Sequence, residues 1–318
     1  MPADQESPDN SDETIGIVIV NYASSVLIAA NLLVTPQKAR VVVVDNWSSA
    51  SERHAVCELT SARGWTLVEM QSNRGFGAGI NAGVVAATEL GCTSLLLLNP
   101  DAQVAAETVE ALRTACLSEK RALISPRLVD SKGQVVFAGS LLDLRNGRIR
   151  GVRSPQMLPE NAPGQTLIWL TAACLAMHRD LWQRLGGFDE GFFLYWEDVD
   201  LNYRAHAIGG QVSLRSDLTA VHDQGGTQKS RRGRAKSHTY YFYNCRNRLL
   251  FAARHRGDIK LSQWVAATPT VSWDILMRGG RRQLLHSPQL LCSAVAGTLS
   301  GLVMLLADRS RLNRLRSR

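Results

Sequence analysis

Three carboxylates stand within four positions of one short segment of the sequence. Glu197, Asp198 and Asp200 follow the aromatic run 192–196 (FFLYW), and a pair of glycines at 186–187 precedes that run. Acidic residues gather at the first turn of a helix, where the helix dipole favours negative charge, or at a site that holds a proton or a cation. The aromatic run would place these acids beside an apolar wall. The pattern therefore favours a chemical site over a simple helix cap.

Helical spacing separates the roles of these acids. Residues three apart share a helix face and direct neighbours do not, so we expect Glu197 and Asp200 on one face and Asp198 on another. A carboxylate within hydrogen-bond reach of a hydroxyl group can accept its proton while a new bond forms. The segment thus offers one general base, with an acidic first turn as the alternative interpretation.

A second acidic site follows an apolar run. Residues 95–98 are four leucines, and Asn99-Pro100-Asp101 ends the run. Because the residue before a proline stays extended, Asn99 should end a strand and Asp101 should project at its tip. Magnesium is usually held by one or two carboxylates together with phosphate oxygens. We therefore expect Asp101 to hold a metal ion against a diphosphate, although the tripeptide alone also fits an ordinary turn.

Two further segments suggest a nucleotide. Asp45 follows the apolar run 41–44, so it can accept a hydrogen bond from a ribose hydroxyl or a base edge, or it can cap the next helix. The stretch 73–79 (NRGFGAG) is rich in glycine, but its spacing is neither that of a P-loop nor that of a dinucleotide site. It fits a closely packed turn into a helix or a phosphate contact through Arg74. Asn81 lies one helical turn further on and is expected to reach the same cleft.

One histidine also enters the candidate set. His222 follows the apolar stretch 218–221 and precedes Asp223 and two glycines. A lone histidine is more often structural than a ligand, but this setting favours a contact with a metal or a phosphate. The arginines that follow it (231, 232 and 234) fit a solvated loop first and a phosphate contact second.

Apolar runs and helical segments alternate through the first two hundred residues. The sequence predicts strands at 15–20, 41–44, 66–70 and 95–98, and helices at 24–34, 52–62, from the glycine stretch to 90, and at 105–117. This alternation predicts an α/β fold, a Rossmann-like, mostly parallel sheet with helices on both faces, and 130–165 a hairpin and loop insertion. Ligands bind beyond the carboxyl ends of such strands, where Asn21, Asp45 and Asn99 stand.

Composition and charge bound the class of protein. The chain has 318 residues, 45% of them hydrophobic and 20% charged, as in ordinary globular proteins. Its six scattered cysteines form no Cys-x-x-Cys pair, which argues against a zinc site and a disulfide framework and fits a reducing cytosol. Residues 1–227 carry a net charge of −7 and residues 228–318 carry +15. So basic a segment implies a polyanionic partner.

We divide the chain into three parts on these grounds. Residues 1–14 are expected to be a disordered acidic tail, which is unlike a signal peptide. Residues 15–227 form the domain that carries the candidate nucleotide and catalytic sites, and residues 228–318 form a basic helical C-terminal extension.

Taken in order, these motifs resemble family 2 glycosyltransferases, the inverting group with the GT-A fold. The resemblance covers roughly residues 15–256. Its motifs are IVIVNY at 17–22, VDN at 44–46, NRGFG at 73–77, NPD at 99–101, GFDE at 187–190 and EDVD at 197–200. NPD in place of the usual Asp-x-Asp, and YNCRNR at 243–248, resemble the bacterial rhamnosyltransferase branch. Trp47 departs from the pattern, because the family usually has Asp-Asn-Gly-Ser where this chain has Asp-Asn-Trp-Ser.

The resemblance implies a role for each candidate residue. Asp198 would be the catalytic base. Mg²⁺ or Mn²⁺ would be held by Asp101, with His222 completing the site. The nucleotide-sugar donor would be bound by Asn21, Asp45, Arg74, Asn81 and Asn99. The acceptor side would be formed or supported by Trp196, Glu197 and Asp200.

The implied reaction is inverting transfer of L-rhamnose from dTDP-L-rhamnose to a cell-envelope glycan or a polyprenyl-diphosphate-linked acceptor. UDP-galactofuranose or a UDP-hexose are alternative donors. A non-catalytic protein that binds a polyanion or a glycan is the alternative from another class. Nucleic acid is not expected as a partner, since the aromatic residues 240–243 carry few basic neighbours and no nucleic-acid module is recognised.

The C-terminal extension suggests where the enzyme works. Residues 288–307 are mildly apolar and lie between arginines on both sides. The length suits a membrane-spanning helix, but the small and polar residues favour a helix that lies in the interface. We expect a cytoplasmic protein attached peripherally to the inner face of the cell membrane through an anionic surface. A helix packed on the domain is the alternative, and the oligomeric state stays open.

Overall fold

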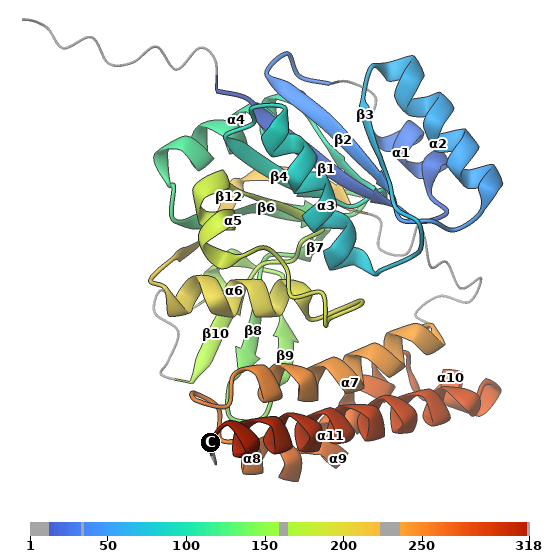
Figure 1. Cartoon of the computed structure of the whole chain (residues 1–318), viewed down its shortest axis with the longest axis vertical. Coiled ribbons are helices and arrows are strands. Elements are labelled where there is room, and N and C mark those ends of the chain that lie inside the picture. Colours follow the sequence, from blue (N-terminus) through green and yellow to red (C-terminus); the bar gives the residue numbers. More distant parts are fainter. Residues whose placement is uncertain (1–12, 33–34, 159–164, 223–235, 317–318) are drawn as a thin grey trace, which may run out of the picture.

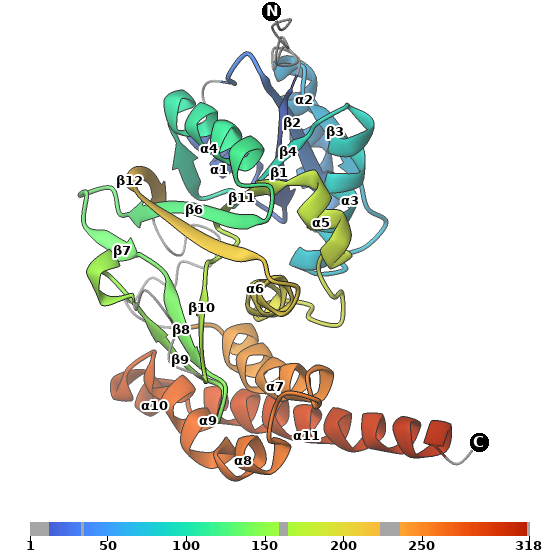
Figure 2. The ribbon, with the colours of Figure 1, turned by 90° about the vertical axis from the view of Figure 1, so that its left-hand side faces the viewer.

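The computed structural model describes residues 13–32, 35–158, 165–222 and 236–316. A large sheet wrapped by helices forms one part of the molecule, and a layer of helices from the end of the chain forms the other (Figure 1). A small sheet and one helix lie between them (Figure 2). The acidic tail expected at 1–14 falls largely outside the described residues, and so does the boundary expected at residue 227. Those two predictions remain untested.

The large sheet has nine strands and runs in the order β3-β2-β1-β4-β11-β6-β12-β5, with β7 paired to β6. The strands are β1 (Ile15–Asn21), β2 (Ala39–Asp45), β3 (Thr66–Glu69), β4 (Ser94–Leu98), β5 (Ala102–Val104), β6 (Ala122–Val129), β7 (Val135–Phe137), β11 (Cys174–His178) and β12 (Gln211–His222). The first half, β3-β2-β1-β4, is parallel, whereas β11 runs antiparallel to β4 and β6. The predicted α/β fold is confirmed, with the antiparallel strands in the second half.

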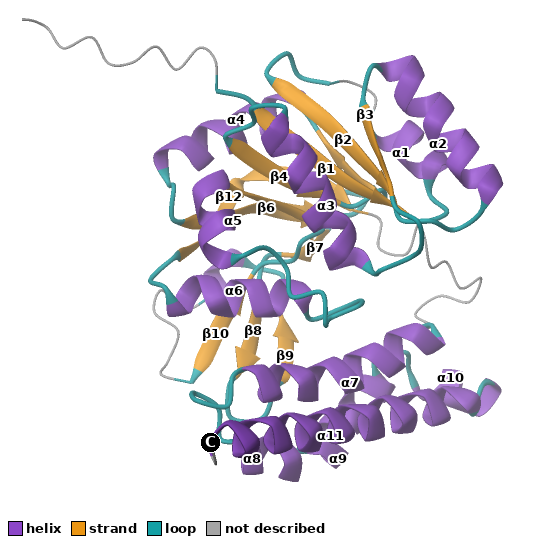
Figure 3. Ribbon diagram, in the orientation of Figure 1, coloured by secondary structure: helices purple, strands orange, loops and turns teal. Residues whose placement is uncertain are grey.

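Helices pack around this sheet (Figure 3). They are α1 (Ser25–Asn31), α2 (Ala50–Arg63), α3 (Phe76–Glu89), α4 (Ala106–Ser118) and α5 (Arg179–Leu185). The apolar runs form strands because every side chain of β1 and β4 is buried, as in a sheet covered on both faces. The glycine stretch is a closely packed turn into α3, where a Cβ atom at Gly75 would lie 2.2 Å from the Phe193 carbonyl oxygen.

The segment 130–165, expected to be a hairpin and loop insertion, supplies β7 to the large sheet and two strands, β8 and β9, to a second, antiparallel sheet in the order β10-β8-β9. Its strands are β8 (Ser140–Asp143), β9 (Arg148–Gly151) and β10 (Thr166–Trp169), and α6 (Glu197–Ala207) contacts β10. Trp169, Trp196, Tyr203, Phe251 and Trp264 share one apolar cluster. This cluster joins the small sheet and α6 to the helices that follow.

The end of the described chain is helical, as expected. It comprises α7 (His238–Arg254), α8 (Leu261–Ala266), α9 (Thr268–Met277), α10 (Arg281–His286) and α11 (Gln289–Arg316). The guanidinium of Arg248 on α7 is buried among these helices and donates to the carbonyl oxygens of Asn146 and Trp264. Burial lowers the pKa of Arg248 to about 10. Because Asn146 belongs to the β8–β9 turn, Arg248 ties the helical layer to the small sheet.

Candidate functional site

The carboxyl ends of β1 and β2 bring two of the predicted donor residues together. Asn21 and Asp45 are register partners in the parallel pair, and Asn21 Nδ2 donates to Asp45 Oδ1 over 3.4 Å. Both side chains are fully buried. The other carboxylate oxygen of Asp45 lies 2.6 Å from Nε of Arg53 on α2. Asp45 is thus enclosed by the Asn21 amide and the Arg53 guanidinium. Neighbouring residues form the exposed surface beside it.

Trp47 forms that surface. Its backbone adopts φ +44°, in the left-handed region that glycine favours, so the tight turn persists although the glycine of the family pattern is absent. The indole is 36% exposed, and the Arg53 guanidinium lies 4.5 Å from the ring centroid. An exposed aromatic residue held in a strained conformation is unusual unless it serves a function. Arg53 was not singled out from the sequence.

The NPD turn is held from both sides. Asn99 pairs through its backbone N–H with the Ala173 carbonyl oxygen at 2.9 Å, next to β11. Asn31, on α1, donates through Nδ2 to the Pro100 carbonyl oxygen at 2.9 Å. Asp101 occupies the turn between β4 and β5, as the sequence predicts for the tip of a strand. Asn31 was not singled out from the sequence, where it is one polar residue in a helix.

The structure brings Asp101 and His222 together. Residue His222, the last of β12, is paired with Ala102 in β5, and its Nε2 atom lies 3.2 Å from Asp101 Oδ1. Its Nδ1 atom is buried and has no hydrogen-bond partner among the described residues. The described part of the chain shows no cluster of three or more His, Cys, Asp or Glu side chains that could hold a metal. One carboxylate and one imidazole still fit a divalent ion whose remaining ligands are diphosphate oxygens and water.

A strained turn leads into the helix that carries the three acids. Tyr195 and Trp196 have φ +64° and +74°, two consecutive non-glycine residues in the left-handed region. Asn247, fully buried on α7, holds this turn by donating through Nδ2 to the carbonyl oxygens of Leu194 at 2.9 Å and Tyr195 at 2.8 Å. Trp196 is buried against Phe251, so it supports the turn from below.

Asp198, at the start of α6, is half-buried and accepts hydrogen bonds from backbone N–H groups of α6 and of the segment before β11. Its Oδ1 accepts from the Val199 N–H at 2.8 Å, and its Oδ2 from the Ala172 N–H at 3.4 Å. Burial raises its pKa to about 6, while the backbone N–H groups of Val199 and Ala172 and the hydroxyl of Thr171 act in the opposite direction. A carboxyl group with a pKa of about 6 is largely ionised near neutral pH and basic enough to accept a proton.

Asn202 positions Asp198 and was not singled out from the sequence. It is fully buried one turn further along α6, and its side chain accepts from the Leu170 N–H at 3.0 Å and donates to the Leu170 carbonyl oxygen at 2.9 Å. It also donates to the Asp198 carbonyl oxygen at 2.7 Å. Asn202 therefore fixes α6 against the segment 170–173, whose other end pairs with Asn99. This segment links the candidate base to the NPD turn.

Glu197 points elsewhere. Its side chain is 6% exposed, and its Cβ lies close to Gly77 at the start of α3. Burial raises its pKa well above the ordinary value, and the charge of Asp198 adds to the effect. Its Oε2 atom is buried without a hydrogen-bond partner among the described residues. These conditions favour a neutral Glu197, which leaves Asp198 as the carboxylate able to accept a proton.

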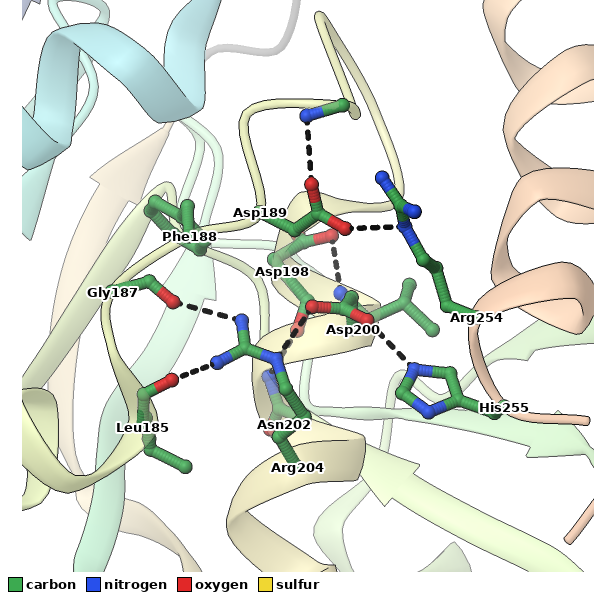
Figure 4. Close-up of polar contacts among 12 residues, drawn as sticks. Leu185, Gly187, Phe188, Asp189, Asp198, Asp200, Asn202, Arg204, Arg254 and His255 are labelled. Carbon is green, nitrogen blue, oxygen red and sulfur yellow. Dashed lines mark hydrogen bonds and ion pairs between the residues drawn. The ribbon is translucent and has the colours of Figure 1, made fainter. Parts of the chain in front are cut away.

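Asp200 lies in a structural ion-pair network (Figure 4). The side chain is 1% exposed, with Oδ2 2.7 Å from Arg204 Nε and Oδ1 2.7 Å from His255 Nε2. Arg204 also donates to the carbonyl oxygens of Leu185 and Gly187. Asp200 thus connects α5, α6 and the end of α7. Glu197 and Asp200 are both buried while Asp198 is partly exposed, which agrees with the helical spacing.

Arg74 and Asn81 both contact one loop residue. Arg74 NH2 lies 2.6 Å from Glu190 Oε2, and Asn81 Nδ2 donates to Glu190 Oε1 at 3.1 Å. Asn81 also exchanges two hydrogen bonds with the Phe188 backbone, at 2.9 and 3.0 Å. In this structure both residues fasten the loop 187–190 to α3. Arg74 remains more than half exposed, so its guanidinium is accessible at the rim of the site.

Comparisons with known proteins test the resemblance. No protein-family model matches the sequence. The low-salt glycan biosynthesis hexosyltransferase Agl10 of Haloferax volcanii is 28% identical over 244 residues, which is 75% of this chain and 75% of the relative. The N-acetylglucosaminyl-diphospho-decaprenol L-rhamnosyltransferase of Mycobacterium tuberculosis is 26% identical over 224 residues, which is 62% of this chain and 72% of the relative.

Two solved structures share the fold. The mannosyltransferase PcManGT from Pyrobaculum calidifontis, in complex with GDP-Man and Mn²⁺, aligns with a TM-score of 0.55 at 17% identity and covers 96% of this chain and 89% of its own. GalNAc-T7 with UDP, GalNAc and Mn²⁺ aligns with a TM-score of 0.52 at 17% identity, over 88% of this chain and 58% of its own. The fold, the motifs and the curated relatives agree, and the chain is a glycosyltransferase of the GT-A type that resembles family 2.

Proposed function

We propose that the protein is an inverting, metal-dependent glycosyltransferase that transfers L-rhamnose from dTDP-L-rhamnose to a cell-envelope acceptor. One observation carries the proposal. Asp198 has a carboxylate of raised pKa, partly exposed to solvent, on a helix fixed to the segment 170–173 that also pairs with the NPD turn. The segment 170–173 thus supports both the proposed proton acceptor and the turn proposed to bind the diphosphate.

In the proposed reaction the acceptor hydroxyl gives its proton to Asp198. The hydroxyl oxygen forms a bond to the anomeric carbon from the face opposite the nucleotide, and the bond between that carbon and the diphosphate oxygen breaks. The nucleoside diphosphate leaves with the electron pair of that bond, and the anomeric configuration inverts because the hydroxyl attacks from the opposite face. Asp101 and His222 would hold Mg²⁺ or Mn²⁺, which supplies positive charge beside the leaving diphosphate.

The donor assignment rests on the site and on the relatives together. We assign donor binding to Asn21, Asp45, Arg74, Asn81 and Asn99. The carboxyl ends of β1, β2 and β4, where the nucleotide of an α/β sheet binds, carry Asn21, Asp45 and Asn99. The mycobacterial relative is named an L-rhamnosyltransferase and the haloarchaeal one a hexosyltransferase, so dTDP-L-rhamnose is our first donor and a UDP-hexose or UDP-galactofuranose the second.

We propose a polyprenyl-diphosphate-linked glycan as the acceptor. The support is the name of the mycobacterial relative, which includes a diphospho-decaprenol. An acceptor of this kind is anchored in a membrane, so the enzyme would work in the cytoplasm at the inner membrane face. The strained turn 195–196 and the buried pair Glu197 and Asp200 then support the acceptor side of the site.

Titration calorimetry with dTDP, UDP and GDP, each with and without Mn²⁺, tests the donor and the metal. We expect dTDP to bind in the presence of Mn²⁺, and Asp101→Asn to remove the effect of the metal. The exposed aspartate Asp217, paired with Arg215, gives the matched control, and Asp217→Asn should leave binding unchanged. Tighter binding of UDP or GDP would replace the donor assignment. Binding of no nucleotide would contradict the proposal.

A further inference from the structure

Helix α11 buries one face against α7. Leu290, Ala294, Gly297, Gly301 and Leu305 are buried at spacings of three and four residues. A Cβ atom at Gly297 would lie 2.1 Å from the Phe242 carbonyl oxygen, and one at Gly301 would lie 2.9 Å from the Arg246 carbonyl oxygen. Only glycine permits backbones to approach so closely. This face of α11 therefore belongs to the interior of the folded protein.

The opposite face of α11 is apolar and uncovered. Between residues 291 and 307 every exposed residue is apolar: Leu291, Cys292, Val295, Ala296, Leu299, Val303, Leu306 and Ala307. The exposed fraction rises along the helix, to 57% at Leu299, 64% at Val303 and 65% at Leu306. A surface helix of a soluble domain carries polar residues on its outer face, and a continuous exposed apolar strip marks an interaction surface. We call these eight residues the apolar stripe.

Positive charge flanks the apolar stripe at both ends. Residues 275–318 contain eight arginines and one acidic residue, Asp308. Arg281 and Arg282 are exposed on α10, before the stripe, and five arginines lie beyond residue 308. Two copies of this helix would bring basic ends together in a parallel or an antiparallel pairing. An anionic surface has the complementary charge.

We propose that the apolar stripe of α11 lies in the headgroup region of an anionic lipid bilayer, with the helix parallel to the membrane plane. This partner deepens the proposed function, since it rests on a lipid-linked acceptor. Gln289–Ala307 is long and apolar enough to cross a membrane. A spanning helix would nevertheless have to leave α7, whose buried Arg248 and Asn247 belong to the folded domain. The packing of α11 on α7 therefore favours a helix that lies parallel to the membrane plane over one that spans the membrane.

The geometry places the active site on the protein side of this surface. In both views α7 lies between α6, which carries Asp198, and α11 (Figures 1 and 2). Phe251 of α7 packs on Tyr203 of α6, with ring centroids 5.3 Å apart. One layer of the protein, formed by α7, therefore separates the active site from the proposed membrane face. An acceptor must extend its sugar out of the bilayer by the thickness of this layer.

Vesicle flotation of the full chain tests the proposal. We expect the protein to float with phosphatidylcholine vesicles that contain phosphatidylglycerol, to float less at high salt, and to stay unbound with phosphatidylcholine alone. The double variant Leu299→Gln/Val303→Gln should lower the partition coefficient by at least about 30-fold. Val26→Gln/Val85→Gln changes two valines away from the stripe that are 79% and 58% exposed, so at least as exposed as the stripe pair, and should bind as the wild type does.

Two cysteines give a second readout that does not depend on stability. Of the cysteines, Cys292 lies in the apolar stripe and Cys57 is exposed on α2, while the other four are buried. A polarity-sensitive dye on Cys292, in the variant Cys57→Ser, should shift its emission to the blue when anionic vesicles are added. The same dye on Cys57, in the variant Cys292→Ser, should show no shift.

Several outcomes would overturn the proposal. They are absence of flotation at low salt, unchanged flotation of the stripe variant, and a dye on Cys292 that stays in water. Self-association that the stripe variant abolishes, without vesicle binding, would assign the stripe to a second copy of the chain. Resistance of the membrane-bound protein to alkaline extraction would indicate a spanning helix. Calorimetry with nucleotide separates these results from failure of the enzyme, because the stripe variant should bind nucleotide as the wild type does.

Discussion

Replacing Thr171 by valine should shift the pH dependence of transfer. The pKa of Asp198 is raised to about 6 by burial, and the Thr171 hydroxyl is one of the groups that oppose this rise by stabilising the ionised form. A general base works only when it is ionised. The wild-type rate should therefore fall about tenfold for each pH unit below 6 and level off above pH ~7. Without the Thr171 hydroxyl the ionised form of Asp198 loses a hydrogen bond, so the pKa of Asp198 should rise.

The size of the shift follows from the value of one hydrogen bond. A hydrogen bond to a charged group contributes about 1.5–3 kcal/mol, and one pKa unit corresponds to about 1.4 kcal/mol. Because the Val199 and Ala172 N–H groups remain, we take the lower value and expect a shift of about one unit. At pH 6 the ionised fraction would fall from about one half to about one tenth. The rate at pH 6 should then fall about fivefold, with the rate at pH 8 unchanged.

The assay is the initial rate of transfer between pH 5 and pH 9 for the wild type and Thr171→Val. Ionisation of the donor diphosphate affects both proteins equally, so the difference between their profiles reports on the enzyme. Thr114→Val, on the exposed side of α4, is the matched control. Identical profiles for the wild type and Thr171→Val would refute the role of the hydroxyl. A wild-type rate that is flat from pH 5 to pH 8 would refute Asp198 as the base.

Three further variants test the site and its support. Asp198→Asn should lower transfer by about 10²- to 10⁴-fold. The same variant should raise the melting temperature at pH 8, because the raised pKa of Asp198 means that the folded protein loses stability when this carboxyl group ionises as pH rises through 6. An unchanged or lower melting temperature would contradict this. Asp200→Asn leaves Arg204 and His255 without their carboxylate, and urea unfolding should show a loss of about 3 kcal/mol, whereas a loss below ~1 kcal/mol would argue against a structural network. Trp47→Gly relieves the left-handed strain but removes aromatic surface beside the donor site, so calorimetry should show about tenfold weaker binding of dTDP; tighter binding would show that Trp47 obstructs the site.

The motifs predicted the parallel half of the sheet because its strands are continuous apolar runs. Residues 15–20, 41–44 and 95–98 correspond to β1, β2 and β4, and the polar residue after each run lies at its carboxyl end. The antiparallel strand β11 could not be inferred in the same way. Its sequence is as apolar as those of the parallel strands, and the direction in which a buried strand runs depends on the path of the chain around it.

The residues that hold the candidate site in place could not be predicted from the sequence either. Asn202 and Asn31 look like ordinary polar residues in helices, and the YNCRNR motif that contains Asn247 does not indicate its partner. Each becomes important because folding brings a backbone carbonyl or N–H group from a distant segment within 3 Å of its side chain. The spacing of Glu197, Asp198 and Asp200 did predict which acids share a buried face, since that follows from helix geometry alone.

Local periodicity and charge are enough to predict the class of fold, the acidic site and the basic character of the C-terminal segment. Tertiary packing was needed to show that Asp200 belongs to a structural ion-pair network while Asp198 stays partly exposed, since His255 reaches Asp200 from the end of α7 and Arg204 binds the carbonyl oxygens of Leu185 and Gly187. It also decided which face of α11 is buried. That helix is apolar on nearly every side, and only its packing on α7 shows which side chains are left uncovered.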